Sequence, residues 1–476
     1  MQTASHHAAG ASLRPALTCL ALCMLMPSLD TSIANAGLPT LARALGASFQ
    51  QAQWIVLAYL VAVTTLIVSV ARWGDLVGRR RLLLGGIALF TLASLLCGTA
   101  PALGWLIAAR AVQGLGAAVM MALTVAFVGE TVPKAKTGSA MGLLGTMSAV
   151  GTSLGPSLGG MLMATLSWHA IFLVNVPLGI ANWLLAYHYL PHDRPTSAAD
   201  RPRFDYIGTL LLALTLMAYA LAMTIGHAHF GWFNATLLSF AAVGAVLFVL
   251  AQARSAAPLI RLALFRDPVL SASLAASTLV SAVMMTTLVV GPFYLSLALG
   301  LKTAAVGFVL SAGPLVSALC GVPAGWVVDR FGAPRVAAAG LAALACGCAA
   351  LSLLSPDFGI AGYLACIVVV TPGYAAFQAA NNTLIMADVR ADERGVVSGL
   401  LSLSRNLGLI TGASVMASVF AFASAMSGIA SAHAAAAAIG MHAAFAVATV
   451  LIVAALAIAT ASRILFARRA MTGDSA

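Results

Sequence analysis

Charged residues are scarce in this chain of 476 residues. Asp, Glu, Lys and Arg together make up 8% of it, against about 25% in soluble globular domains. Apolar residues make up 61%, and the mean hydropathy is +1.01. This composition excludes a soluble domain with a single anchor and predicts a protein that crosses the membrane many times.

The chain also lacks a disulfide framework and nucleotide-binding or metal-binding motifs. Its seven cysteines lie in apolar segments and predict no disulfide scaffold. It has no zinc motif, P-loop or pair of catalytic acids, so we expect no metal, no cofactor and no ATP hydrolysis in this chain. GTSLG at 151–155 formally matches the nucleophile elbow of hydrolases, but that motif needs a preceding strand and a following soluble helix. We therefore expect a protein that is not an enzyme.

Basic residues exceed acidic ones, with a formal net charge of +11. They fall between apolar segments rather than on one soluble face, which argues against nucleic acid and indicates membrane topology. Fourteen apolar segments are long enough to span a bilayer as helices. They lie near 16–38, 52–72, 82–99, 104–128, 139–165, 171–190, 206–226, 235–253, 269–299, 304–326, 336–355, 360–387, 396–425 and 436–462.

The distribution of Lys and Arg tests this count. With a cytoplasmic N-terminus, 20 of the 24 fall in inside segments, Arg43 and Lys302 fall outside, and Arg110 and Arg405 lie within helices. The positive-inside rule predicts such a bias, so we expect both termini in the cytoplasm of a bacterial inner membrane. Residues 34–36 imitate a signal-peptide cleavage site, but the first apolar run continues through Asp30 and Pro39, which favours a retained helix.

Two loops repeat. ARWGDLVGRRR at 71–81 and GWVVDRFGAPR at 325–335 each place an Asp three residues before a Gly, followed by basic residues. A duplicated loop predicts two related six-helix bundles with a site between them. The predicted division is a first bundle at 1–190, a linker with two extra central helices at 191–264, and a second bundle with a short cytoplasmic tail at 265–476.

A glycine-rich segment lies at 142–160 and reads GLLGTMSAVGTSLGPSLGG. Gly151, Gly155 and Gly159 are four residues apart and share one helix face, which lets a second helix approach closely. Pro156 lies among them and predicts a bend. Packing of helices is one reading of this stripe, and a functional motif is the other.

These features together resemble the fourteen-helix drug:proton antiporter branch of the major facilitator superfamily. Gly142, Gly151, Gly155-Pro156 and Gly159-Gly160 match its antiporter motif, and both repeated loops resemble its signature loop. Further matches are LDTSIANAGLP (29–39), Gln53-Trp54, Arg110 with Gln113 and Gly114, FLVNVPLG (172–179) and FDYIG (204–208). The resemblance implies an all-α polytopic membrane protein with the major facilitator fold.

Asp30 is the only carboxylate well inside an apolar segment, and an ionised group there is costly and usually functional. Burial favours the neutral acid and a nearby cation favours the ionised one. The resemblance assigns proton coupling to Asp30, with Arg110 as its partner cation. The alternatives are a structural hydrogen bond or ion pair for Asp30 and helix-end contacts for Arg110.

The repeated loops supply candidate gating residues. By resemblance, their charges make inter-helix ion pairs and capping contacts that stabilise one facing of a transporter, and Glu130 is a candidate partner for Arg79. The alternative is anchoring to the inner membrane surface. The gating set is Asp75, Gly78, Arg79, Glu130, Asp329, Arg330, Gly332 and Arg335.

Polar residues within apolar helices predict a substrate cavity, although each could equally join two helices. They are Asn35, Tyr59, Gln113, Tyr294, Gln378, Asn381 and Asn382. Pro372-Gly373 also predicts a break in 360–387 that could face a cavity.

The resulting hypothesis is a proton-coupled multidrug efflux transporter that exports amphipathic, mainly cationic compounds by alternating access. Its expected partners are a small-molecule substrate, protons and the lipid bilayer. We expect a monomer, with accessory export proteins left open. Two alternatives remain: a narrow-specificity exporter of a metabolite or natural product, and a non-transporting membrane sensor.

Overall fold

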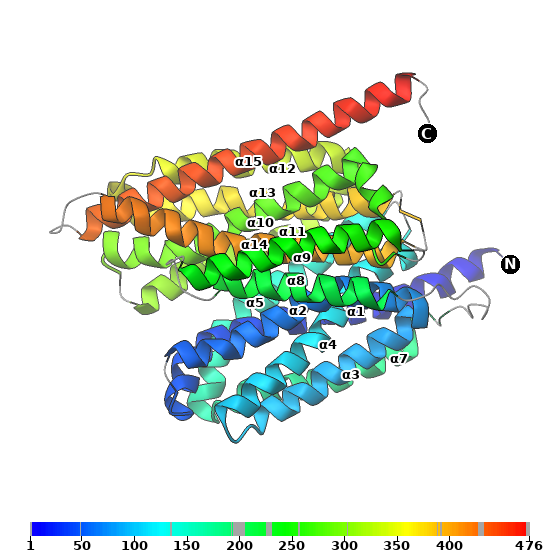
Figure 1. Cartoon of the computed structure of the whole chain (residues 1–476), viewed down its shortest axis with the longest axis horizontal. Coiled ribbons are helices and arrows are strands. Elements are labelled where there is room, and N and C mark those ends of the chain that lie inside the picture. The colour runs from blue at the N-terminus through cyan, green and yellow to red at the C-terminus, as the bar shows by residue number, and fades with distance from the viewer. Residues whose placement is uncertain are drawn as a thin grey trace.

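Long helices run side by side through the structure (Figure 1). The computed structural model describes residues 2–47, 49–133, 136–191, 193, 205–224, 231–255, 258–301, 303–387, 389–390, 393–426 and 433–472. These residues contain no strand, so the expectation of an all-helical chain is confirmed for them.

The helices fall into three consecutive groups along the chain. The first comprises α1 (Gln2–Ala44), α2 (Phe49–Val77), α3 (Arg79–Gly98), α4 (Leu103–Thr131), α5 (Thr137–Thr165), α6 (Ala170–Leu173) and α7 (Asn175–Tyr189). Next come α8 (Tyr206–Thr224) and α9 (Trp232–Arg254). The last comprises η3 (Leu262–Arg266), α10 (Pro268–Phe293), η4 (Tyr294–Ala298), α11 (Thr303–Phe331), α12 (Ala333–Ser352), η5 (Pro356–Phe358), α13 (Gly359–Ala387), α14 (Arg394–Met426) and α15 (His433–Thr472).

Most of these helices are long and apolar enough to cross a membrane. Among the described residues, twelve meet that description by length and composition, and α2 contributes a shorter apolar stretch at 54–67. The glycine-rich α5 has 29 residues, about 43 Å at 1.5 Å per residue, which exceeds the thickness of the hydrocarbon layer. The arrangement is therefore compatible with fourteen spans.

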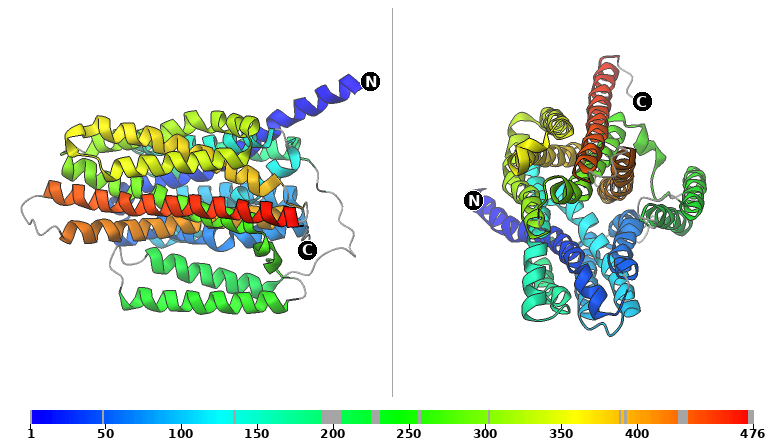
Figure 2. Two further views of the ribbon diagram at one scale, coloured as in Figure 1. Left: turned by 90° about the horizontal axis from the view of Figure 1, so that it is seen from above. Right: turned by 90° about the vertical axis from the view of Figure 1, so that its left-hand side faces the viewer.

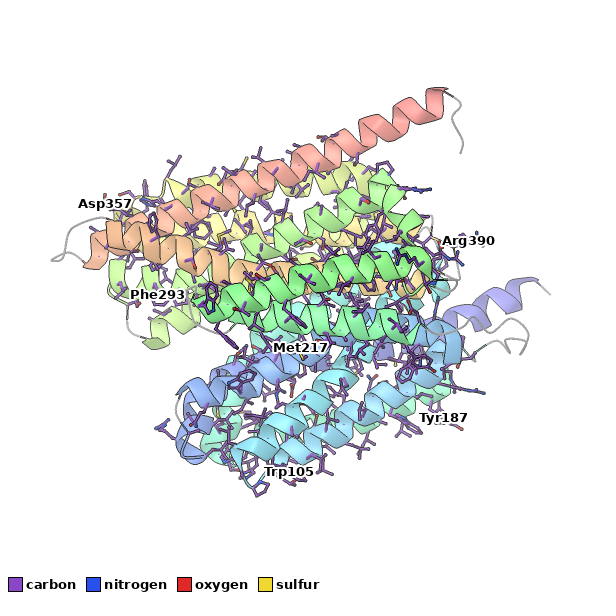
Figure 3. All side chains as sticks on the ribbon, in the orientation of Figure 1. Trp105, Tyr187, Met217, Phe293, Asp357 and Arg390 are labelled. Carbon is purple, nitrogen blue, oxygen red and sulfur yellow. The ribbon has the colours of Figure 1, made fainter. Side chains whose placement is uncertain are left out.

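The outer surface is apolar in the way that lipid contact requires. On α9, Phe240, Val246 and Leu250 are exposed, a pattern that water would oppose. Exposed aromatic residues lie at opposite ends of the first group of helices, Trp105 at one end and Tyr187 at the other (Figure 3). Such residues are enriched at the two membrane interfaces.

Both chain termini lie at one end of the molecule, which we call the termini end (Figure 1). The helices of the first group pack mainly on one another, as do those of the last group. The two groups, here the N-terminal and C-terminal halves, meet chiefly where α5 contacts α11 and where α2 and α4 contact α14. The domain boundaries expected near 190 and 264 remain predictions.

The helices α8 and α9 form a hairpin at the side of the bundle (Figure 2). The main contact with the rest of the protein is made by α8, which packs against α2 of the N-terminal half and α14 of the C-terminal half, while α9 makes a smaller contact with η3. The Asn234 side chain of α9 donates a 2.7 Å hydrogen bond to the carbonyl of Ala222 in α8, so the hairpin is fastened internally as well.

The predicted break at Pro372-Gly373 is wrong. The helix α13 continues from Gly359 to Ala387 without interruption. Gly373 instead lies against α12, where an added Cβ would be 3.0 Å from the carbonyl oxygen of Gly340. A proline removes one hydrogen bond of a helix, and here close packing on α12 supports the helix across that point.

Candidate functional site

Asp30 of α1 and Arg110 of α4 form an ion pair deep inside the N-terminal half. Their side chains are 1% and 0% exposed, and Nη1 of Arg110 donates to Oδ2 of Asp30. Among the side chains that the structure describes, Asp30 is the only buried carboxylate. Two opposite charges are thus held together in a region where either alone would be costly.

Two side-chain amides complete the coordination of Asp30. Nε2 of Gln113 and Nδ2 of Asn175 donate to its Oδ1 at 2.9 and 2.7 Å. Oε1 of Gln113 accepts from Nη1 of Arg110 at 2.6 Å, and Nε2 of Gln113 also donates to Oγ of Ser94 at 2.8 Å. Every described hydrogen-bond partner of Asp30 is therefore a donor, and a carboxylate has the lone pairs to accept from all three.

Arg110 is held by groups from three further positions. Its Nε donates to the carbonyl of Ile55 in α2 at 3.0 Å. Its guanidinium carbon lies 4.4 Å from the centre of the Tyr59 ring and 5.7 Å from that of Phe172. Aromatic faces stabilise a cation in a dry environment. They therefore support the positive charge of Arg110 independently of Asp30.

The glycine stripe of α5 holds α1, the helix that carries Asp30. A Cβ at Gly151 would lie 2.6 Å from the carbonyl oxygen of Leu25, and one at Gly155 would clash with Ser32. Gly159 packs on Ile33 of the same helix. Oγ of Ser32 donates to the carbonyl of Thr152 at 2.7 Å, which fixes the register of the two helices.

The other two motif glycines have different surroundings. Gly142 faces α11 of the C-terminal half, with the carbonyl oxygen of Gly321 less than 3.0 Å from a Cβ built on it. Gly160 has no neighbouring atom within 4 Å of such a Cβ. The side chain of Pro156 lies outside the described residues, and α5 continues as one helix through that position.

Asp329 joins the two halves at the termini end. Its carboxylate accepts from the backbone nitrogens of Gly138 and Ser139, at 2.9 and 3.0 Å, and from the Ser139 hydroxyl. These groups form the start of α5, and a carboxylate there satisfies free N–H groups and complements the helix dipole. The last turn of α11 is thereby bound to the first turn of α5.

The duplicated loops share a backbone conformation as well as a sequence. Gly78 precedes α3 with φ 108°, and Gly332 precedes α12 with φ 85°. Both values lie in the region that favours glycine. The side chain of Asp193 accepts from the backbone nitrogens of Arg80 and Arg81 at 2.9 and 3.1 Å, which caps α3 much as Asp329 caps α5.

The remaining gating residues have varied positions. Arg79 is the first residue of α3. Arg335 is exposed, and the guanidinium carbon of Arg330 lies 5.7 Å from the centre of the Phe331 ring. The side chains of Asp75 and Glu130 lie outside the described residues.

The structure does not gather the seven predicted cavity residues in one place. Tyr59 and Gln113 are buried around Arg110, whereas Asn35 is exposed. Tyr294 is fully buried in the C-terminal half, with its ring centre 6.1 Å from that of Tyr363. The other three line cavities.

Gln378 and Asn382 line a cavity of about 20 Å³ between the two halves, together with Arg405. A space of that size has room for little more than one water molecule. The space around these three side chains is therefore small.

Asn381 lines a larger cavity of about 840 Å³ inside the C-terminal half. Its walls come mainly from α10, α12, α13 and α15, and charged residues are part of its lining. Two of these charges pair, because Nη1 of Arg261 lies 3.1 Å from Oε1 of Glu393. A third, Asp267, accepts from the backbone nitrogen of Val269 and caps α10. The described residues contain no group of three metal-ligating side chains.

Asn175 was not among the predicted site residues, although it lies in the segment 172–179 that carries part of the family resemblance. The available signal was a polar side chain in an apolar helix, the same signal that selected Asn381. The same signal led to the prediction that Gln113 lines a substrate cavity. In the structure Gln113 instead bridges Asp30 and Arg110.

Comparison with known proteins places this geometry in a family. The family model described as Major Facilitator Superfamily matches residues 20–413. The human organic anion transporter MFSD10 (TETRAN) superposes with a TM-score of 0.67 at 16% identity, over 94% of this chain and 99% of that one. At that identity the likeness shows the fold.

Curated relatives share more of the sequence. The uncharacterized transporter YebQ of Escherichia coli K12 is 32% identical over 82% of this chain and 86% of its own length. The riboflavin transporter RibZ of Clostridioides difficile is 30% identical, over 83% and 86% respectively. The multidrug resistance protein Stp of Mycobacterium tuberculosis CDC 1551 / Oshkosh is 33% identical, over 84% and 74%. The chain therefore belongs to the major facilitator superfamily and is a multi-pass membrane transporter rather than an enzyme.

Proposed function

We propose that this transporter exports amphipathic compounds, cationic ones foremost, in exchange for protons. The observation that carries the proposal is the buried pair of Asp30 and Arg110, with two amides bound to the same carboxylate. An acid with no role in transport would be costly at this depth. Among the described side chains it is the only buried carboxylate, and a carboxylate can gain and lose one proton.

Proton binding is coupled to transport because the net charge of the site differs between ionised and protonated Asp30. When Asp30 is ionised, it and Arg110 form a neutral pair. When Asp30 takes up a proton, Arg110 carries an unbalanced charge between Tyr59 and Phe172, and the attraction between α1 and α4 weakens. A proton can therefore change the relative stability of two facings of the transporter, which is the requirement for coupling.

The contacts between the halves support alternating access. Asp329 and the glycines of α5 and α11 close the termini end, and the space beside Gln378 and Asn382 is small. If both termini are cytoplasmic, as the distribution of Lys and Arg suggests, this closed end faces the cytoplasm. Substrate would then enter after Asp329 releases α5 and leave from the opposite side.

The substrate class is supported by the names of relatives. Stp is named a multidrug resistance protein. MdtD of Salmonella heidelberg strain SL476, which is 32% identical, is named a putative multidrug resistance protein. RibZ, named a riboflavin transporter, favours a second candidate, a transporter for one amphipathic metabolite. Both candidates use the same proton site.

The test is transport by the purified protein in liposomes with an imposed inward-acid gradient and a pH-sensitive dye. Ethidium and riboflavin are added separately. We expect proton movement that depends on a substrate and is lost in Asp30→Asn, but is retained in Asp357→Asn, which alters an exposed acid at the end away from the termini (Figure 3). Substrate-driven proton flux that persists in Asp30→Asn would remove Asp30 as the coupling site.

A further inference from the structure

We propose that the side-chain amide of Asn175 turns over when Asp30 gains or loses its proton, so that Asn175 acts as a positioning residue for both charge states. The inference rests on the proposed function, because it assumes that Asp30 binds a proton. It goes further by assigning to Asn175 a role that neither the motifs nor the repeats indicated.

In the observed arrangement every described partner of Asp30 donates a hydrogen bond to it. The donors are Nη1 of Arg110, Nε2 of Gln113 and Nδ2 of Asn175. An ionised carboxylate accepts all three. A protonated one must instead donate its O–H, and a buried donor without an acceptor is costly. Protonation of Asp30 therefore requires one partner to present an acceptor.

Gln113 is fixed in its present orientation. Its Oε1 accepts from Nη1 of Arg110 at 2.6 Å and from Sγ of Cys97 at 3.7 Å. Its Nε2 donates to Oγ of Ser94 as well as to Asp30. Rotation of this amide by half a turn would place its N–H groups against Arg110, which has no acceptor.

Asn175 is not fixed in this way. Its Oδ1 is buried and has no hydrogen-bond partner, while its Nδ2 donates to Asp30. Half a turn exchanges the two atoms: Nδ2 takes the unpartnered place, and Oδ1 faces Asp30. The number of unpartnered atoms of the amide stays the same, and the site gains the acceptor that a protonated Asp30 needs.

The proton balance is simple. The incoming proton forms an O–H bond at Oδ1 of Asp30, the hydrogen bond from Nδ2 of Asn175 is broken, and an O–H···O bond to its Oδ1 replaces it. Arg110 keeps its charge throughout. The titratable neighbours among the described residues are Arg110 on α4, Tyr59 on α2 and Cys97 on α3, and none of them has to change its protonation state.

The chain provides a matched control in Asn182, which lies on the same helix two turns further on. Asn182 is also fully buried, its Oδ1 also lacks a partner, and its Nδ2 donates to Sγ of Cys23 at 3.2 Å. It makes no contact with Asp30 among the hydrogen bonds described. Asn182→Leu therefore measures the general effect of removing a buried amide from α7.

The first experiment is pH-difference infrared spectroscopy on the purified transporter with ¹³C-labelled asparagine side chains. We expect a carboxyl band that titrates and disappears in Asp30→Asn, and a labelled amide band that shifts with it. The amide shift should be lost in Asn175→Leu and retained in Asn182→Leu. An amide shift that persists in Asn175→Leu, or a carboxyl band that titrates without any amide shift, would overturn the proposal and leave Asp30 as the proton site. Absence of any band assignable to Asp30 would instead overturn the proposed coupling site together with this inference.

The second experiment separates proton coupling from substrate movement. Asn175→Leu should lower net proton-driven transport by about 10- to 100-fold, the effect of an unpartnered buried donor. It should leave substrate exchange in the absence of a gradient within about twofold of wild type. Asn175→Ser keeps a group that both donates and accepts and should recover part of the loss. Equal losses of exchange and net transport in both variants would indicate a purely structural role and contradict the inference.

Discussion

Gly142 of α5 lies directly against the main chain of Gly321 in α11, with no room for a side chain between the two helices. Gly138 and Gly325 meet in the same way one turn nearer the termini end. The two halves of the transporter are therefore in backbone contact at this end. A larger side chain at either glycine would therefore destabilise the state in which the termini end is closed.

The first prediction concerns Gly142→Leu. Insertion of extra side-chain atoms into a packed contact costs about 1–3 kcal/mol, and here the cost falls on the state that is closed at the termini end. We expect that end to open more often. The measurement is the labelling rate of Asn382→Cys, in the small cavity between the halves, by a thiol reagent applied from the side of the termini.

We expect the labelling rate to rise by about 5- to 150-fold, since about 1.4 kcal/mol corresponds to a factor of ten. Gly160→Leu is the control, because it lies on the same helix and has open space around it. Equal labelling in Gly142→Leu and the parent would contradict closure through this contact.

A second prediction concerns Asp329→Ala. Loss of a capping side chain costs about 0.5–2 kcal/mol, and this cap crosses between the halves. We expect the same reporter cysteine to be labelled about 2- to 30-fold faster. Asp267→Ala removes a cap of the same kind, on Val269 of α10, but within one half. It should lower thermal stability without faster labelling, and faster labelling in both variants would point to general loosening instead.

Signals within a single segment of the sequence predicted which residues matter and which helix face packs. A charged residue in an apolar segment is costly and therefore rare, and this signal selected Asp30 and Arg110 as candidate site residues. The spacing of Gly151, Gly155 and Gly159 predicted one packed helix face, which the structure shows against α1. These signals are local to one segment.

The partners of these residues could not be predicted, because they are set by tertiary packing. Asn175 reaches Asp30 across 145 residues of sequence, and no periodicity in either segment indicates that contact. Gly142 and Gly151 share a motif but face different helices, α11 and α1. Asp193 lies in a polar linker and nevertheless caps α3.

The third prediction separates stability from coupling at the buried ion pair. Asp30→Ala leaves Arg110 without its counter-charge, and breaking a buried pair in this way costs about 3–5 kcal/mol. We expect a clear fall in the apparent unfolding temperature in detergent. The combination of Asp30→Asn with Arg110→Gln removes both charges and should recover most of that loss, yet it should show no substrate-driven proton flux.

The matched control is Arg335→Gln, which removes an exposed cation and should change neither quantity. Recovery of stability without recovery of proton flux would assign the charges to coupling. If the double variant were as unstable as Asp30→Ala, the cost would come from the polar network and not from an unbalanced charge.

The last prediction concerns the hairpin of α8 and α9, which contacts both halves. Its described hydrogen bonds to the rest of the protein favour the C-terminal half: the Ser414 hydroxyl of α14 donates to the carbonyl of Met223, and the hydroxyls of Tyr219 and Thr411 bond to each other. We therefore expect the hairpin to move with α14 during alternating access.

Met223→Cys with Ser414→Cys, joined by a short bifunctional thiol reagent, should retain transport within about twofold, because no relative motion is blocked. Met223→Cys alone and Ser414→Cys alone, each treated with the same reagent, control for reaction at the exposed native Cys346. Loss of transport in the joined protein alone would show that α8 slides on α14 and that the hairpin follows the N-terminal half through α2.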